Sequence, residues 1–325
     1  MKNIVIGIDI SSKTLDLCVQ KKNRIDYFVI DNRIKTIKTF FNKYKKEEVV
    51  VAMENTGRYN WNLYEVLECF DFKIYVIPPL HLKKSLGLTR GKNDKIDALR
   101  ICNFIVKNLE ETIQWQPTPL PIRRLKTLIT ERSSRIKMKK RLLTQQHDYK
   151  LIKTIGLDKE LTKLNKQLIK KLDDQISLLE KRIEETIKTD AELDYQSKLI
   201  QSVPGAGKVL TWMILAKTEG FRTIKDPRKL ACYAGVVPFD YQSGSSLKYK
   251  PKVSIFADKQ LKTILHLAAM SAVRLDNDLR IYYLRKVEEG KNKMSVLNAV
   301  RNKIVHRIFA VVKNQSVYKN NLVLS

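Results

Sequence analysis

The sequence predicts an α/β domain at the amino-terminus, a long helical section in the middle and a mainly α-helical domain at the carboxy-terminus. Three observations support this prediction. Short β-branched runs alternate with helical patterns over residues 1–115. Residues 116–195 carry apolar side chains at helical spacing, and residues 196–325 hold several further helical patterns. A chain of 325 residues is long enough for two or three domains that each bury a core.

The first hundred residues predict the order of the sheet. Three strand-like segments, at 4–10, 15–20 and 25–31, are joined by short connections, which predicts an antiparallel meander. Helix and strand patterns then alternate, at 34–45, 48–53, 60–70 and 72–77. This order is typical of an RNase H-like sandwich, in which the first strand is central. Carboxylates at the strand ends of such a sheet gather on one edge.

Four carboxylates occupy the positions that this edge would bring together. Asp9 and Glu54 each end an apolar run, and Asp94 and Asp97 stand three apart at the start of a helical pattern, so they share one helix face. Clustered oxygen anions without neighbouring Cys or His suit the hard cation Mg²⁺, with Mn²⁺ as the alternative. The set predicts a metal-dependent phosphodiester enzyme. Ordinary turn residues at strand ends are the other interpretation.

The charge of the chain indicates a polyanionic partner. The formal net charge is +28, and residues 196–325 hold more than half of this excess, with 23 Lys and Arg against 8 Asp and Glu. Such a surface favours DNA or RNA, and its binding should weaken as salt rises. The longest apolar runs are about six residues, far below the roughly 20 that a membrane span needs. We therefore expect a cytoplasmic protein with no membrane partner. The four cysteines are scattered and predict neither disulfides nor a zinc site.

Three basic segments are candidates for phosphate contact. Arg90 and Lys92 lie in a Gly-containing loop just before Asp94, and Lys248 and Lys250 follow a Ser-Gly-Ser-Ser run. Between two helical patterns, the turn at 203–208 resembles the hairpin of a helix-hairpin-helix motif, in which glycines let backbone N–H groups approach a DNA phosphate. Its candidate residues are Gly205, Gly207 and Lys208. The alternative for the loop before Asp94 is a solvated surface loop. The alternative for the turn at 203–208 is a plain connection between two helices.

The middle section predicts a paired helix, within one chain or between two. From Leu161, apolar residues recur about every 3.7 positions, which indicates an almost straight association of helices rather than strict heptads. The stripe continues through Leu164, Leu168, Leu172, Ile176, Leu179, Ile183 and Ile187. We expect this coiled-coil section, residues 116–195, to act as a scaffold or a dimerisation arm.

Six motifs in order resemble the insertion-sequence-110 family of DEDD transposases, which includes Piv-like invertases and bridge-RNA-guided recombinases. The resemblance spans almost the full chain, and the order and spacing of the motifs make it specific. The motifs are Gly7-Ile8-Asp9, Glu54-Asn55-Thr56-Gly57, Asn93-Asp94-Lys95-Ile96-Asp97-Ala98, Val203-Pro204-Gly205-Ala206-Gly207, Tyr233-Ala234-Gly235-Val236-Val237-Pro238 and Ser243-Gly244-Ser245-Ser246.

The resemblance implies a RuvC-type RNase H-like domain at 1–115 and a carboxy-terminal transposase domain at 196–325, joined by the coiled coil. It implies that Ser243 is the nucleophile, forming a covalent phosphoserine link to DNA beside Mg²⁺ held by the four carboxylates. It further implies a composite active site in a homo-oligomer, a dimer or tetramer, and a structured guide RNA that pairs with DNA. The chain departs from the family pattern at 254–259, where relatives tend to carry a basic segment with a Gly.

Three other functions are consistent with parts of the sequence. A junction resolvase would use the carboxylates and water, without a covalent adduct. An actin-like sugar kinase could begin with the run at 7–12, but the chain lacks the further Gly-rich phosphate loops, and its charge does not suit a metabolite enzyme. A domesticated nucleic-acid-binding protein would bind without cleavage, although the presence of all four carboxylates argues against it.

Overall fold

The computed structural model describes residues 4–22, 24–85, 93–243, 247–275 and 277–320, with the backbone alone for 150, 240–243 and 247–252. The chain forms two compact units, Met1–Pro117 and Thr118–Ser325. Each unit has its own hydrophobic core, and each is described by itself below.

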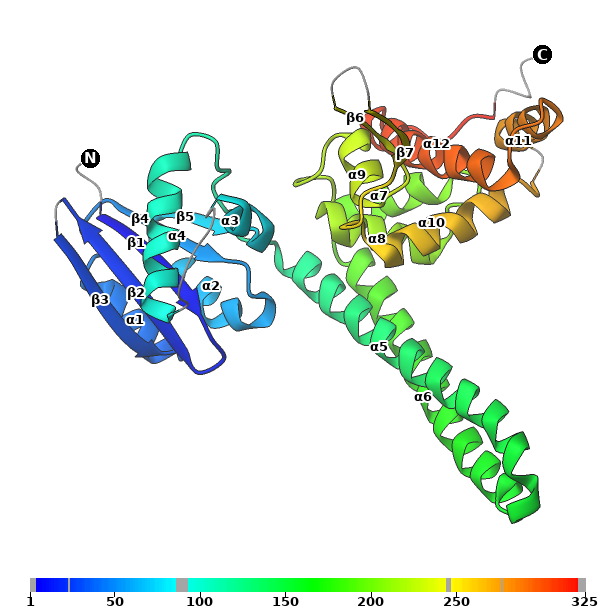
Figure 1. Ribbon diagram of the computed structural model, residues 1–325, viewed down its shortest axis with the longest axis horizontal. Coiled ribbons are helices and arrows are strands. Elements are labelled where there is room, and N and C mark those ends of the chain that lie inside the picture. The colour runs from blue at the N-terminus through cyan, green and yellow to red at the C-terminus, as the bar shows by residue number, and fades with distance from the viewer. Residues whose placement is uncertain (1–3, 23, 86–92, 244–246, 276, 321–325) are drawn as a thin grey trace. The chain divides into compact units, whose positions relative to one another are not determined.

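The first unit is built on a five-stranded sheet in the order β3-β2-β1-β4-β5 (Figure 1). Strands β1, β2 and β3 form the predicted antiparallel meander, and β4 and β5 continue parallel to β1. The first strand is therefore central, as the sequence predicts. The bounds are Ile4–Ile10 for β1, Thr14–Lys21 for β2, Arg24–Asp31 for β3, Val49–Glu54 for β4 and Lys73–Ile77 for β5.

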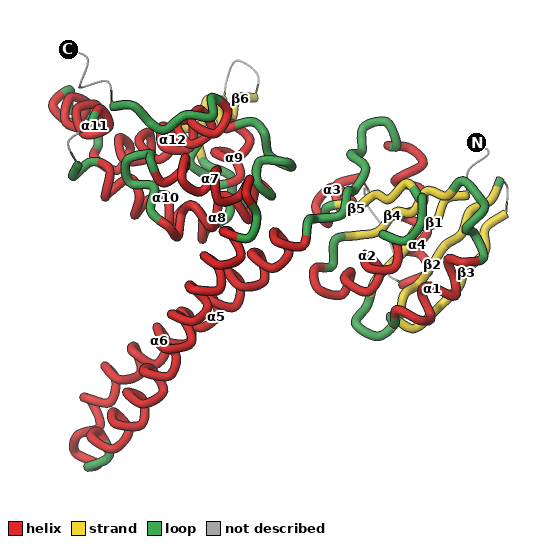
Figure 2. Tube along the Cα trace, turned by 180° about the vertical axis from the view of Figure 1, so that it is seen from behind, coloured by secondary structure: helices red, strands yellow, loops and turns green. Residues whose placement is uncertain are grey.

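Helices cover both faces of this sheet, because alternate residues of the central strands are apolar on each side. Ile4, Ile6 and Ile8 point to the face packed by α1 (Ile34–Asn42) and α2 (Trp61–Leu67). Val5 points to the other face, which α4 (Asp94–Asn108) covers (Figure 2). Two short helices complete the unit, the 3₁₀ helix η1 (Gly57–Asn60) and α3 (Pro79–Ser85). This α/β architecture is compatible with an RNase H-like fold.

The second unit begins with two long helices that pack against each other within one chain. They are α5 (Leu120–Asp148) and α6 (Asp158–Lys188), joined by the 3₁₀ helix η2 (Tyr149–Ile155). The predicted apolar stripe holds at the end of α6, where Ile183 and Ile187 are buried. It fails earlier, because Leu164 and Leu168 are 50% and 51% exposed while Asn165 is buried and donates to the Leu142 carbonyl oxygen at 3.4 Å.

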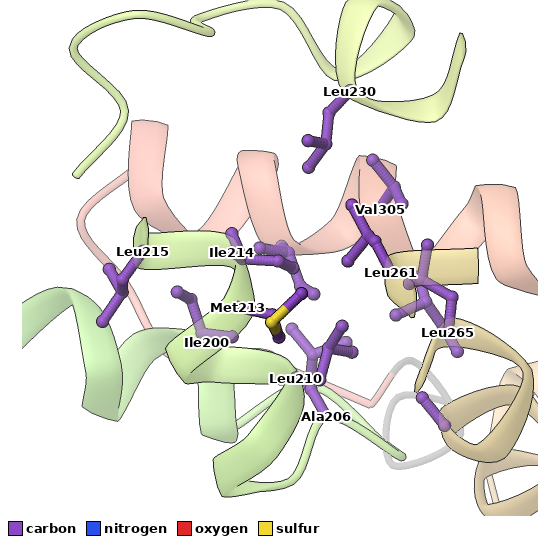
Figure 3. Close-up of a cluster of buried hydrophobic side chains, with 14 of the residues drawn as sticks. Ile200, Ala206, Leu210, Met213, Ile214, Leu215, Leu230, Leu261, Leu265 and Val305 are labelled. Atoms are coloured by element: carbon purple, nitrogen blue, oxygen red, sulfur yellow. The ribbon is translucent and has the colours of Figure 1, made fainter. Parts of the chain in front are cut away.

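The rest of the second unit is a helical bundle that carries one β-hairpin. The helices are α7 (Ala191–Gln201), α8 (Lys208–Thr218), α9 (Pro227–Tyr233), α10 (Lys259–Ala272), α11 (Asp278–Glu288) and α12 (Lys293–Lys313). Strands β6 (Phe239–Ser243) and β7 (Leu247–Lys252) pair antiparallel. Figure 3 shows the core, where Leu210 and Met213 of α8 lie among Leu261 and Leu265 of α10. Among the described residues, no helix combines the length and apolar character that crossing a membrane requires.

Candidate active site

Strand pairing places Asp9 and Glu54 side by side. Strands β1 and β4 run parallel, and Ile8 is paired with Met53. The next residue of each strand, Asp9 in β1 and Glu54 in β4, therefore lies at the same edge of the sheet. Both continue the alternation that points Val5 toward α4, so both lie on the α4 face. The expectation that these two strand ends meet is confirmed by this register.

Helix α4 supplies Asp94 and Asp97 in its first turn. Asn93 caps the helix, since its side-chain oxygen accepts from the Lys95 backbone N–H at 3.0 Å. The helix lies directly on β1 at Gly7: a Cβ added there would lie 2.4 Å from the Ala98 carbonyl oxygen and 2.5 Å from the Cys102 backbone nitrogen. Only glycine allows this approach, which brings the start of α4 to the strand end at Asp9.

The electrostatics of Asp9 indicate that the other three carboxylates lie near enough to act on it. Burial, and after it the negative charge of Asp97, raise the pKa of Asp9 to about 6, and the charges of Asp94 and Glu54 contribute less. A hydrogen bond from the Ile10 backbone N–H, 3.0 Å from Oδ1, acts in the opposite direction. Each of the three other carboxylates therefore interacts with Asp9, which is the centre of the set.

A fifth carboxylate, Asp16, belongs to the same edge and was missed by sequence reasoning. It pairs with Asp9 across the antiparallel β1–β2 ladder. Burial raises the pKa of Asp16, and the charge of Asp94 raises it further, while Lys95 lowers it. The sequence could have predicted this position, because the tight connection between the first two strands fixes their register and so places Asp16 opposite Asp9.

The carboxylate cluster fits a divalent metal in its chemistry. The donors are hard oxygens, and their mutual repulsion at Asp9 is what a divalent cation would relieve. The described residues contain no group of three or more His, Cys, Asp or Glu side chains already arranged around a common metal position. Asp97 is instead paired with Arg100, whose Nη1 lies 2.7 Å from Oδ1. Binding a metal would therefore require these side chains to rearrange.

Ser243 and the predicted phosphate-binding lysines of the hairpin belong to the second unit. Ser243 ends strand β6 and pairs with Leu247, and Lys248 and Lys250 lie in β7. The sequence predicted a polar loop at 243–246; the structure places Ser243 in strand β6, and residues 244–246 lie outside the described residues. Arg90 and Lys92 lie outside the described residues.

The glycine-containing turn at 203–208 joins α7 to α8 and is packed against α10. Gly205 has a φ of +83°, and a Cβ there would lie 2.3 Å from the Ala268 carbonyl oxygen. Gly207 and Lys208 are exposed, and the Lys208 Nζ lies 2.6 Å from Glu184 Oε1 of α6. The conformation and packing of Gly205 account for glycine at that position. A phosphate contact at the exposed part of the turn stays a prediction.

The segment that departs from the family pattern forms the start of α10. Asp258 caps the helix by accepting from the Leu261 backbone N–H at 2.9 Å, and its Oδ2 lies 2.8 Å from Lys217 Nζ. The Tyr233 hydroxyl donates to the same oxygen at 3.2 Å. Asp258 thus joins α8, α9 and α10.

Comparison with known proteins identifies the family in both units. A family of DEDD transposases of the IS110 type matches residues 6–149, and the family described as transposase IS116/IS110/IS902 matches residues 197–284. The first match contains all four predicted carboxylates, and the second contains Ser243.

Similar proteins include full-length and partial matches. The pilin gene-inverting protein of Moraxella lacunata is 25% identical, with 99% of each chain covered. The transposase for insertion sequence element IS1111A of Coxiella burnetii is 22% identical over 98% of this chain and 92% of its own length. An uncharacterised 44.8 kDa protein of insertion element IS116 from Streptomyces clavuligerus is 26% identical over 45% of this chain and 36% of its own. The chain belongs to the IS110/IS116/IS902 family of DEDD transposases and is an enzyme of that class.

Proposed function

We propose that this transposase cleaves and rejoins DNA strands through a covalent link between Ser243 and DNA. The observation that supports a metal-dependent reaction is that the charges of Asp97, Asp94 and Glu54 all act on the half-buried carboxylate of Asp9. A bound Mg²⁺, or Mn²⁺, would neutralise charge on the scissile phosphate and lower the proton affinity of a nearby hydroxyl. The four carboxylates would hold that ion, and Asp9, at their centre, would be the ligand that the site can least afford to lose.

In the proposed reaction the Ser243 hydroxyl loses its proton and its Oγ forms a bond to phosphorus. The bond from phosphorus to one deoxyribose oxygen breaks, and that oxygen takes up a proton. One phosphoester replaces another, so the link retains the energy needed to join the phosphate to a different strand. When the hydroxyl of that strand attacks, Ser243 is released unchanged. Strand exchange would then require no external energy source.

The carboxylates and Ser243 belong to different units of the chain, and the resemblance to the family implies that the two sets come from different subunits. We propose a homo-oligomer, a dimer or a tetramer, in which the carboxylates of one subunit meet the serine of another. We further propose that a structured guide RNA selects the DNA. The net charge of +28 supports binding of more than one nucleic-acid strand.

The nucleophile is tested by trapping the adduct. Purified protein with Mg²⁺ and DNA that contains the ends of its own element should give a protein–DNA species that survives denaturation. Ser243→Ala should remove that species, while the matched variants Ser245→Ala and Ser246→Ala should keep it. Cleavage without any adduct would refute the serine mechanism and favour a resolvase that uses water, a reaction for which the carboxylate unit alone would suffice.

The metal site is tested with Asp9→Asn, which has nearly the same shape as Asp9 but lacks its charge. We expect cleavage to fall by at least two orders of magnitude while DNA binding is retained, because the metal acts on the transition state. Asp71→Asn is the control, since Asp71 precedes β5 at the opposite end of the parallel strands. Normal cleavage by Asp9→Asn would show that the metal assignment is wrong.

A further inference from the structure

Arg301 of α12 is a buried cation without a carboxylate partner among the described residues. Its side chain is 6% exposed, and its Nε is buried with no hydrogen-bond partner. The neighbouring Arg307, on the same helix, is in contrast paired with Asp278. A buried charge costs several kcal/mol unless an opposite charge offsets it. This burial could not be predicted from the sequence, because Arg301 stands near other basic residues of an amphipathic helix.

The contacts of Arg301 fix the state of His266. The Arg301 Nη2 lies 2.7 Å from His266 Nδ1 of α10, and Nη1 donates to the Asn298 Oδ1 at 3.3 Å. A guanidinium only donates hydrogen bonds, so Nδ1 accepts and the imidazole is neutral, with its proton on Nε2. Burial lowers the pKa of His266, and the charge of Arg301 lowers it further. His266 therefore offers one N–H donor, backed by a positive charge.

The pair of His266 and Arg301 lies next to the start of the β6–β7 hairpin, which carries Ser243. Asn298, which holds Arg301, also donates to the Val236 carbonyl oxygen at 2.8 Å, and Val236 is three residues before β6. Lys262 is one turn before His266 on α10 and passes beside Gly235. His266 is partly exposed, so its donor is accessible to a ligand.

We propose that His266, backed by the charge of Arg301, binds one phosphate group of a nucleic-acid strand beside the hairpin that carries Ser243. A phosphodiester supplies the negative charge that Arg301 lacks and the oxygen acceptor that the Nε2–H of His266 requires. Ser243 is four residues beyond Phe239, roughly 13 Å along an extended strand. The phosphate bound by the pair is therefore some nucleotides away from the phosphate at which the strand is cut. It positions the strand and takes no part in bond breaking. This inference rests on the proposed nucleic-acid function and adds a binding site to it.

The test is binding of DNA and RNA oligonucleotides of the same sequence, in EDTA and over a series of salt concentrations. His266→Ala and Arg301→Met should each weaken binding about tenfold, the loss expected for one charge-assisted contact. Arg301→Met should also reduce the slope of log affinity against log salt by about one. His306→Ala is the matched control, an exposed histidine on α12, and should change neither quantity.

The two nucleic acids distinguish the source of the phosphate. Weakening for DNA alone assigns the site to a DNA strand, weakening for RNA alone assigns it to a guide RNA, and weakening for both assigns a shared site. Unchanged affinity and salt slope in both variants would overturn the proposal, as would a wild-type protein that binds neither oligonucleotide. Because EDTA prevents metal-dependent cleavage, failure of the serine mechanism would leave this result intact.

Thermal unfolding distinguishes two roles for the His266–Arg301 pair, binding a phosphate or only holding α10 against α12. If Arg301 is an unneutralised cation in the free protein, Arg301→Met should melt at or above the wild-type temperature. Arg307→Met should melt lower, because it leaves Asp278 without its partner. If Arg301→Met instead melts well below wild type and His266→Ala binds normally, the pair is structural and the proposal is wrong.

Discussion

Gly7 controls the carboxylate cluster at the scale of a single residue. The Cβ of Gly7→Ala would meet the backbone of α4 at Ala98 and Cys102, so the helix would have to move off β1. We expect a loss of about 1–3 kcal/mol in the free energy of unfolding, as for other overpacked sites. Displacing α4 would also separate Asp94 and Asp97 from Asp9, so metal-dependent cleavage should fall by more than the loss of folded protein explains.

Urea unfolding and cleavage assays of the same preparation check this prediction. The free energy of unfolding gives the folded fraction, and the cleavage rate per folded molecule gives the effect on the site. A variant with wild-type cleavage per folded molecule would contradict the role of Gly7 in positioning α4. A variant with unchanged stability would show that α4 can shift without cost.

Residue identity pointed to some positions of the candidate site and not to others. Asp9 and Glu54 were visible because each ends an apolar run, a pattern contained in a few consecutive residues. Asp16 and Arg301 were not, because their roles depend on strand register and on the packing of α10 against α12. Gly205 was singled out as a candidate phosphate contact, which stays a prediction, and the structure adds a reason for glycine in its φ of +83° and its packing against α10. The contact of Gly205 with the backbone of α10 could not be predicted from the turn, because α10 is some 60 residues further along the chain.

At the scale of elements, the start of α10 depends on Asp258. Burial raises the pKa of this carboxyl, but hydrogen bonds from Lys217, the Leu261 backbone and Tyr233 outweigh burial and hold its pKa below the ordinary value. Asp258→Asn keeps a good helix cap and loses the ion pair, so we expect a loss of about 1–2 kcal/mol. Asp258→Ala also loses the cap and should cost about 1 kcal/mol more.

The same carboxyl predicts a dependence of stability on pH. A group whose pKa is lower in the folded state contributes stability above its unfolded pKa, about 3.9 for Asp, and loses it as pH falls through the folded value. The difference in melting temperature between wild type and Asp258→Asn should therefore be constant near pH 6 and shrink as the pH falls below about 4. A difference that grows on acidification would refute the ion pair as its source.

The elements of the first unit were predicted well because each has a strong local pattern. Strands β1, β4 and β5 are mostly apolar runs, β2 and β3 mix apolar and polar residues, and the connections between the first three strands are too short for anything but a meander. The hairpin β6–β7 was not predicted, because each strand carries only two alternating apolar residues, Phe239 and Tyr241 in one and Leu247 and Tyr249 in the other, within a run that is otherwise polar. The α6 stripe failed at Leu164 and Leu168 because partner contacts, here around Asn165, decide which face of a long helix is covered.

At the scale of the whole molecule, the two units have separate cores. The first unit is held by apolar clusters on the two faces of its sheet, and the second by a single cluster that extends from Ile122 to Val312. Separate cores predict two unfolding transitions rather than one cooperative event. The carboxylates belong entirely to the first unit, so a bound metal should stabilise that unit alone.

Calorimetry with and without Mg²⁺ tests this organisation. Ligand at one hundred times its dissociation constant adds about 2.7 kcal/mol to the stability of the state that binds it. For a unit of this size we expect one transition to rise by on the order of 10 °C while the other stays in place. EDTA should reverse the rise, and Asp9→Asn should abolish it, whereas Ser243→Ala should leave it unchanged because Ser243 belongs to the other unit. If both transitions rise together in the wild type, the metal couples the two units. A rise that persists in Asp9→Asn would place the ion away from the carboxylate cluster.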